Sequence, residues 1–91
     1  MEKQILMISA ASVVLSLKRQ NPMAIDEEVF QYITDYISSK KIRDESIKVA
    51  MIAAASEAYK LSRENPKLSE KEILKSIMDL IPVIMHRLDD N

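Results

Sequence analysis

The sequence predicts an all-α fold, a four-helix bundle built from two duplicated antiparallel α-hairpins. Three observations support this class: apolar residues recur at helical spacing, the chain repeats itself at an interval of 44 residues, and it contains no glycine. With 91 residues, 47% of them hydrophobic and 30% charged, the chain has the size and composition of one soluble domain, residues 1–91. This apolar content is too high for a disordered chain.

The internal repeat becomes visible when the chain is aligned with itself at an offset of 44 residues. Residues 5–37 then pair with residues 49–81 without a gap, and 13 of the 33 positions are identical. The first repeat covers about residues 3–41 and the second about 45–90. Because the apolar run at residues 5–17 has a copy in the second repeat, we expect a buried helix there rather than a signal peptide. A HEAT-like repeat has a similar two-helix period, but two copies are too few for a stable solenoid.

The first repeat predicts helices near residues 3–20 and 26–40. The first helix ends by Asn21, because Pro22 disfavours α geometry in the residue before it. Asp26 is the predicted N-cap of the second helix. The short loop between them predicts antiparallel neighbours. The apolar side of the second helix is formed by Val29, Phe30, Ile33, Tyr36 and Ile37.

The second repeat predicts helices near residues 45–64 and 69–90. Asp44 is the expected cap of the first of these, and Ser69 with Glu72 forms a capping box for the second. Pro82 lies inside the last helix, where it removes a hydrogen bond and predicts a kink. The first helix of each repeat carries an apolar arc rich in alanine, which lets helix axes approach closely: Met7/Met51, Ala10/Ala54, Ala11/Ala55, Val14/Ala58, Leu17/Leu61, Ile8/Ile52 and Leu15/Tyr59.

The composition argues against several classes of function. Without glycine, phosphate-binding loops and nucleophile elbows are unlikely, and without cysteine, thiolate zinc sites and thiol nucleophiles are excluded. His86 is the one histidine, so a multi-histidine metal site is excluded as well. We therefore expect no enzyme and no cofactor apart from a possible Ca²⁺. The apolar run at residues 5–17 is too short to span a bilayer, so we also expect no membrane association. The expected location is cytoplasmic, the default for such a chain.

Differences between the two copies predict a contact surface on the first repeat. Leu6 and Val13 lie seven residues apart on one helix face where the second copy has alanine and glutamate, and Tyr32 aligns with a serine. An apolar exterior confined to one repeat is most simply explained by a partner. The leading hypothesis is a small non-enzymatic helical interaction module that binds a protein partner or associates with itself through Leu6, Val13 and Tyr32. The competing explanation is that residues 82–91 fold back over this surface.

A second hypothesis is weak calcium binding at the hairpin turns, chiefly the first. Asn21, Asp26, Glu27 and Glu28 supply oxygen atoms of the kind that hard cations prefer. Paired helix-loop-helix units resemble the layout of paired EF-hands, although the EF-hand loop spacing and its glycine are absent. The competing explanation for these acids is helix capping.

A third hypothesis is a nucleic-acid-associated regulator. Lys40, Lys41, Arg43 and Lys48 form the most basic stretch of the chain. Acidic residues interrupt this stretch, and 13 basic against 14 acidic side chains give a net charge of −1. A solvated linker is the stronger interpretation, and nucleic acid is an unlikely partner.

Overall fold

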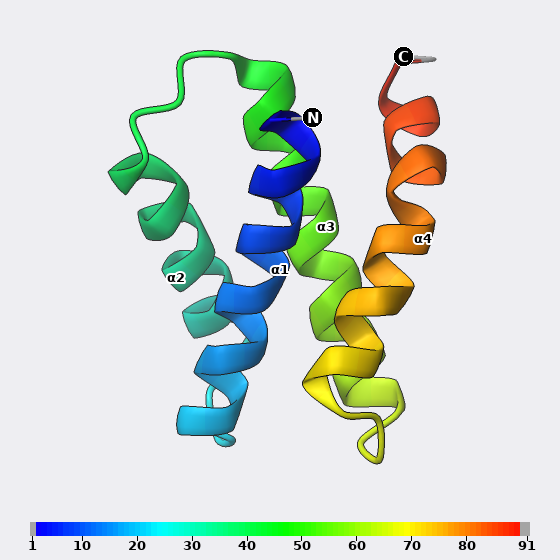
Figure 1. Ribbon diagram of the computed structural model, residues 1–91. Coiled ribbons are helices and arrows are strands. Elements are labelled where there is room, and N and C mark those ends of the chain that lie inside the picture. Colours follow the sequence, from blue (N-terminus) through cyan, green and yellow to red (C-terminus); the bar gives the residue numbers. More distant parts are fainter. Residues whose placement is uncertain (1, 90–91) are drawn as a thin grey trace.

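A computed structural model describes residues 2–89 of the chain and shows four α-helices in that range (Figure 1). The helices are α1 (Glu2–Gln20), α2 (Asp26–Ser39), α3 (Glu45–Glu64) and α4 (Glu70–Asp89). The predicted all-α four-helix fold is confirmed. Each observed boundary lies within one residue of the predicted one, although residue 90, the expected end of the last helix, lies outside the described part of the chain.

The two hairpins pack so that α1 and α3 lie between α2 and α4 (Figure 1). The colours of Figure 1 show that α1 and α3 run in the same direction and that α2 and α4 run in the opposite one. Over the described residues, α2 and α4 do not touch, while α1 and α3 form the most extensive helix contact. Fully buried alanines such as Ala10 and Ala54 permit this contact, because small side chains let two helix axes approach closely.

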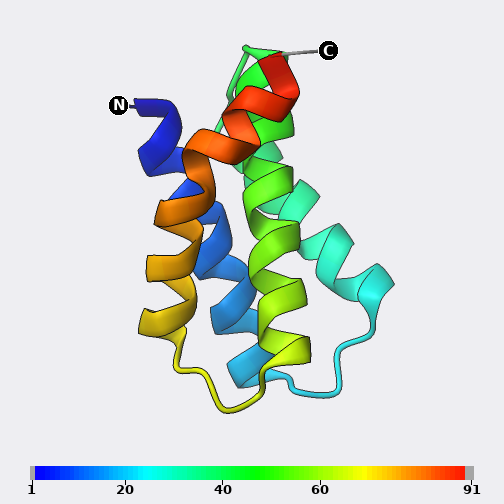
Figure 2. The same cartoon turned by 90° about the vertical axis from the view of Figure 1, so that its right-hand side faces the viewer.

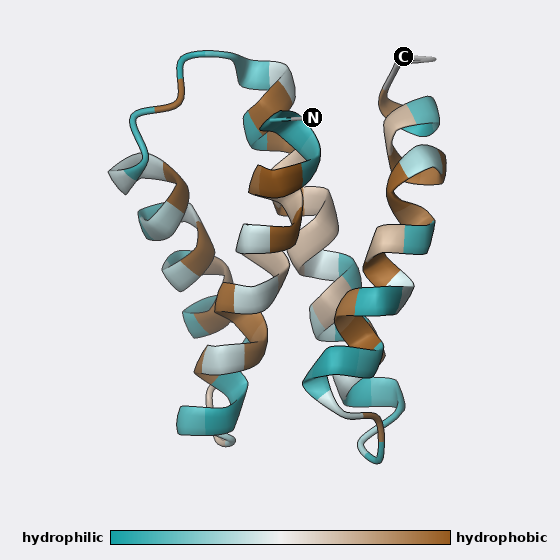
Figure 3. Cartoon of the chain, in the orientation of Figure 1, coloured by the Kyte–Doolittle hydropathy of each residue, from teal (hydrophilic) through white to brown (hydrophobic). Residues whose placement is uncertain are grey.

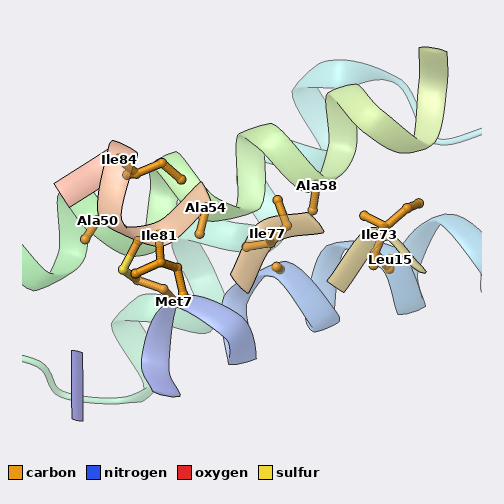
Figure 4. Packing of buried hydrophobic residues seen from close by; sticks show 10 residues of the cluster. Met7, Leu15, Ala50, Ala54, Ala58, Ile73, Ile77, Ile81 and Ile84 are labelled. Atoms are coloured by element: carbon orange, nitrogen blue, oxygen red, sulfur yellow. The ribbon is translucent and has the colours of Figure 1, made fainter. Parts of the chain in front are cut away.

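The hydrophobic core is divided into two clusters, one on either side of the α1–α3 pair. The first cluster joins α1 and α3 to α4, as Figure 4 shows for Met7, Leu15, Ala54, Ile77 and Ile81. The second cluster joins α1 and α3 to α2: it contains Ala10, Val14, Ala24, Val29, Ile33, Ile37, Met51 and Ala55. Consistently, Figure 3 shows hydrophobic residues recurring along α1, α2 and α4, and mostly hydrophilic residues in the α2–α3 and α3–α4 connections. Neither hairpin forms a complete core alone.

The offset of 44 residues also relates the two clusters. Met7 belongs to the first cluster and Met51 to the second, whereas Ala10 belongs to the second and Ala54 to the first. Residues that correspond in the 44-residue alignment therefore belong to opposite clusters. An approximate two-fold axis between the hairpins would produce this exchange. The duplication itself stays a prediction from the sequence.

The helix starts follow the predicted caps at α3 and α4 but not at α2. The Asp44 carboxylate accepts the backbone N–H of Ser46 at 2.9 Å, and Glu72 accepts the N–H of Ser69 at 2.9 Å while donating its own N–H to the Ser69 hydroxyl at 3.1 Å. The prediction that Asp26 caps α2 is wrong: Ile25 is the N-cap, and its side chain accepts no hydrogen bond. Glu28 accepts the N–H of Ile25 at 3.0 Å. Asp26 is thus free to contact α3.

The last helix continues through Pro82 and carries the apolar pattern beyond it. Ile84, two residues past the proline, belongs to the first cluster, and Met85 and Leu88 pack against that cluster. Figure 2 shows the orange and red part of α4 leaning away from the direction of its first turns, which fits the kink expected for a proline inside a helix. Described residues after Pro82 therefore cover the first cluster and not α2. None of the helices within residues 2–89 has the length and apolar content needed to cross a bilayer.

Candidate partner-binding groove

A groove with an apolar floor runs between α2 and α3 on the outer side of the second cluster. Its volume is about 370 Å³. Val29 and Ile33 of α2 meet Ile52 and Ala55 of α3 at its floor. Phe30 lines the same groove with 58% of its surface exposed. The groove is of a size that accommodates a few large apolar side chains.

The exposure of Phe30 corrects the sequence prediction, which placed this residue on the buried side of its helix. Leu74 is the residue at the equivalent position of α4, and it is half-buried against the first cluster. The difference arises because α2 contacts α3 less extensively than α4 contacts α1. A groove remains where α2 stands away from α3, and Phe30 lies at its edge.

One end of the groove holds a polar cluster formed by Asp26, Tyr59 and Arg63. The Tyr59 hydroxyl donates a hydrogen bond to the Asp26 carboxylate, and Arg63 approaches the two carboxylate oxygens at 3.2 and 3.3 Å. The pKa of Asp26 is lowered, first by the Tyr59 hydroxyl and then by Arg63, and the same hydrogen bond raises the pKa of Tyr59. The side chains of both members of the ion pair are largely exposed, at 60% and 71%. The cluster therefore joins α2 to α3 at the groove's end.

Cations surround the Tyr59 ring and extend along the α3 side of the groove. The Lys18 ammonium lies 5.5 Å from the ring centroid and the Arg63 guanidinium 5.4 Å from it. Lys60 is exposed, lines the groove, and makes no hydrogen bond or ion pair with another described residue. The α3 side of the groove can thus attract an anionic group.

The predicted interface residues are divided between α1 and α2, and the two on α1 lie against the second cluster. Leu6 and Val13 are half-buried and pack against this cluster, and Tyr32 is 45% exposed. Ile5, which aligns with the exposed Val49, is 67% exposed, and three further apolar side chains of the first repeat are also more exposed than Tyr32: Met23 at 85%, Ile25 at 57% and Phe30 at 58%. The second copy has a lysine, a serine and a half-buried leucine at these last three positions. Phe30 could not be found by comparing the copies, because it aligns with another apolar residue, Leu74, and the alignment does not show burial. Ile25 aligns with Ser69, so its difference in residue type is of the same kind as that of Tyr32.

The candidate calcium ligands do not converge on one point, because those with contacts bind different groups. Asp26 contacts Tyr59 and Arg63, Glu28 accepts the N–H of Ile25, and the backbone carbonyl of Asn21 accepts the N–H of Ala24 at 3.1 Å. Glu27 is exposed. Among residues 2–89, no three histidine, cysteine, aspartate or glutamate side chains come together in a way that would hold a metal ion. The geometry favours capping and ion pairing as the roles of these residues, and calcium binding stays a prediction.

The basic stretch surrounds the connection between α2 and α3. Lys40 lies 5.1 Å from the centroid of the Tyr36 ring, and Lys48 pairs with Glu45 at 3.1 Å. Lys41 and Arg43 are exposed. Two of these four cations thus already have partners within their own hairpin.

Comparisons of the chain with protein-family models, with curated proteins and with solved structures gave no match. The function is therefore argued from the geometry alone. Within the described residues no polar or charged side chain is buried. The groove offers apolar contact area and exposed charges, which are features suited to recognition.

Proposed function

We propose that the chain is a small non-enzymatic interaction module that binds an amphipathic helix of a protein partner in the α2–α3 groove. The exposed Phe30 beside an apolar floor carries this proposal. Aromatic side chains at the edge of a pocket are frequent anchors of protein interfaces, because they remove a large apolar area from water on binding. Helix-in-groove recognition uses this type of surface.

The charges around the groove indicate which helix fits. Lys60 and Arg63 line the α3 side, and Arg63 is already paired with Asp26. A partner helix is therefore expected to insert two or three large apolar side chains between α2 and α3 and to place a carboxylate beside Lys60. Charge complementarity of this kind sets the orientation of the partner more than its affinity.

The proposal is tested by selecting amphipathic helices that bind the full chain from a displayed peptide library and mapping the amide shifts they cause. We expect the shifts to centre on the groove. Phe30→Glu should weaken the binding of the selected peptides at least about tenfold, or about 1.4 kcal/mol, because the variant loses the aromatic anchor and places a charge beside the apolar floor. Met78→Glu is the matched control, because Met78 is 59% exposed but lies on α4. Shifts on another face, or equal losses in the two variants, contradict the proposal.

The cytoplasmic location remains part of this proposal, and a chain without cysteine needs no oxidising compartment in order to fold. The surface of Leu6, Val13 and Tyr32 remains a second proposed contact on the same cluster. Calcium and nucleic acid stay sequence predictions, because no contact of the described residues favours either.

A further inference from the structure

The two hairpins contact each other through corresponding positions, although α4 packs on α1 more extensively than α2 packs on α3. Both core clusters combine residues of the two hairpins, and two ion pairs cross between them: Arg19 to Glu70 at 2.7 Å and Arg63 to Asp26 at 3.2 Å. In the 44-residue alignment, Arg19 corresponds to Arg63 and Asp26 to Glu70. Corresponding residues of the two hairpins therefore form the ion pairs in both directions.

A single short connection joins the hairpins, and one of its residues has an unfavourable backbone conformation. Residues 40–44 pass from the end of α2 to the start of α3 (Figure 1). Lys41 has a φ of 54°, the one positive φ among the described residues. Its N–H donates to the carbonyl of Ser38 at 3.2 Å, as in helix ends where glycine is the usual residue at this position. A side chain with a β-carbon disfavours this left-handed conformation.

The same connection is compatible with a continuous helix. From Asp26 to Glu64 the chain contains neither glycine nor proline. The N–H of Ser46, which now bonds to Asp44, would find a carbonyl one turn earlier in a helix that runs through residues 40–44. If residues 40–44 become helical, the backbone N–H of Ser46 therefore keeps a hydrogen-bond acceptor. Lys41 at the same time takes the favourable helical conformation.

We propose that two copies of the chain form a dimer by exchanging hairpins. In this dimer residues 40–44 are helical, α2 and α3 of each copy form one long helix, and the second hairpin of each copy packs on the first hairpin of the other. All contacts between hairpins re-form between copies, so the dimer differs from the monomer mainly at the two hinges. Each dimer also carries two α2–α3 grooves, so hairpin exchange does not depend on the proposed function.

The first experiment changes the hinge and measures the dimer by light scattering after refolding at millimolar concentration. Lys41→Gly and Lys40→Gly disfavour a helical hinge equally, but only Lys41→Gly relieves the left-handed conformation in the monomer. Glycine at position 41 should favour the closed hinge of the monomer roughly fivefold. Because two hinges open in each dimer, the dimer association constant of Lys41→Gly should be roughly 25-fold below that of Lys40→Gly. Lys41→Ile should raise the constant above that of the unchanged chain, because a β-branched residue disfavours the closed hinge most. Equal constants for all hinge variants, or an unchanged chain that stays monomeric, overturn the proposal.

The second experiment distinguishes exchanged hairpins from two closed copies that touch through a surface. Arg19→Glu and Glu70→Arg each place like charges opposite one another between the hairpins of one copy. When the two variants are refolded together, an exchanged heterodimer pairs the introduced carboxylate with the introduced guanidinium in one half and restores the original pair in the other. Native mass spectrometry should show roughly fivefold more heterodimer than random mixing gives, since two exposed repulsions are removed. A statistical mixture indicates a surface dimer and overturns hairpin exchange, while binding of helices in the groove is tested separately by Phe30→Glu.

Discussion

Arg63 in the last turn of α3 binds Asp26 in the first turn of α2, and this contact joins two residues that are 37 positions apart in the chain. The mirror contact, Arg19 with Glu70, joins α1 to α4 at the same end of the bundle. Arg19 and Arg63 lie in the last turns of α1 and α3, where the helix dipole favours a cation. The structure adds a second role, because each arginine also reaches across to the other hairpin.

Acidification should destabilise the fold through Asp26. Its pKa is lowered in the folded chain, chiefly by the Tyr59 hydroxyl and further by Arg63, from an ordinary value of 3.8. A carboxyl with a lowered folded-state pKa contributes stability above its unfolded pKa, and this contribution is lost as the pH falls through the folded pKa. Thermal midpoints measured from neutral pH down to about pH 2 should therefore fall most steeply below about pH 4.

Asp26→Asn should make that acid decline shallower, whereas Asp35→Asn should not change it. Asp35 is exposed and accepts a hydrogen bond from the Gln31 amide on its own helix, at 2.8 Å. Asp44 and Glu72 also have lowered pKa values, through Ser46 and Ser69 respectively, so part of the decline remains in either variant. Identical acid profiles for Asp26→Asn and the unchanged chain would show that the contacts of Asp26 with Tyr59 and Arg63 do not stabilise the fold in solution.

Removing a core methionine should cost much of the stability of this small domain. Met51 is fully buried in the second cluster, and Met51→Ala leaves a cavity there. The free energy of unfolding should fall by about 2–5 kcal/mol. Met78→Ala, at a 59% exposed position, should change it by less than about 0.5 kcal/mol. Urea unfolding of the two variants compares them directly, and similar losses would mean that the two clusters are not the core.

Val13→Glu decides between two roles for the predicted contact surface. Val13 is half-buried against the second cluster, and the second copy has Glu57, also half-buried, at the corresponding position. We expect the variant to fold with a loss of about 1–2 kcal/mol, because part of an apolar side chain leaves the core. Urea unfolding gives this loss and light scattering gives any change in mass. Complete unfolding would place Val13 in the core and remove it from the proposed interface.

The helix boundaries could be predicted because their causes are local in sequence. Prolines at 22 and 66 end the preceding helices, and Ser69 with Glu72 starts α4 within one turn. The groove could not be predicted in this way. Exposure of Phe30 depends on how closely α2 approaches α3, and the contact of Asp26 with Arg63 depends on how the two hairpins pack. Periodicity assigns a residue to a side of its own helix, but it does not give the distance to the neighbouring helix.

Giving α2 the cap that α4 already has should stabilise the protein. Ile25 occupies the N-cap of α2 in extended geometry, with φ −85° and ψ 166°, but it offers no oxygen to the first N–H groups of the helix. Ser69 occupies the corresponding position before α4 and accepts the N–H of Glu72. Because Glu28 already accepts the N–H of Ile25, Ile25→Ser would complete a capping box of the kind seen at Ser69.

The expected gain is about 1 kcal/mol in the free energy of unfolding, the usual difference between serine and an aliphatic residue at an N-cap. Since 57% of Ile25 is exposed, only a minor part of its apolar surface leaves a packed environment in the variant. Ser69→Ala is the matched reverse change and should lower stability by a similar amount. Urea unfolding of both variants provides the measurement. If Ile25→Ser destabilises the chain while Ser69→Ala behaves as expected, Ile25 contributes more through apolar contact than a hydroxyl cap would return, and the first turn of α2 is held by packing.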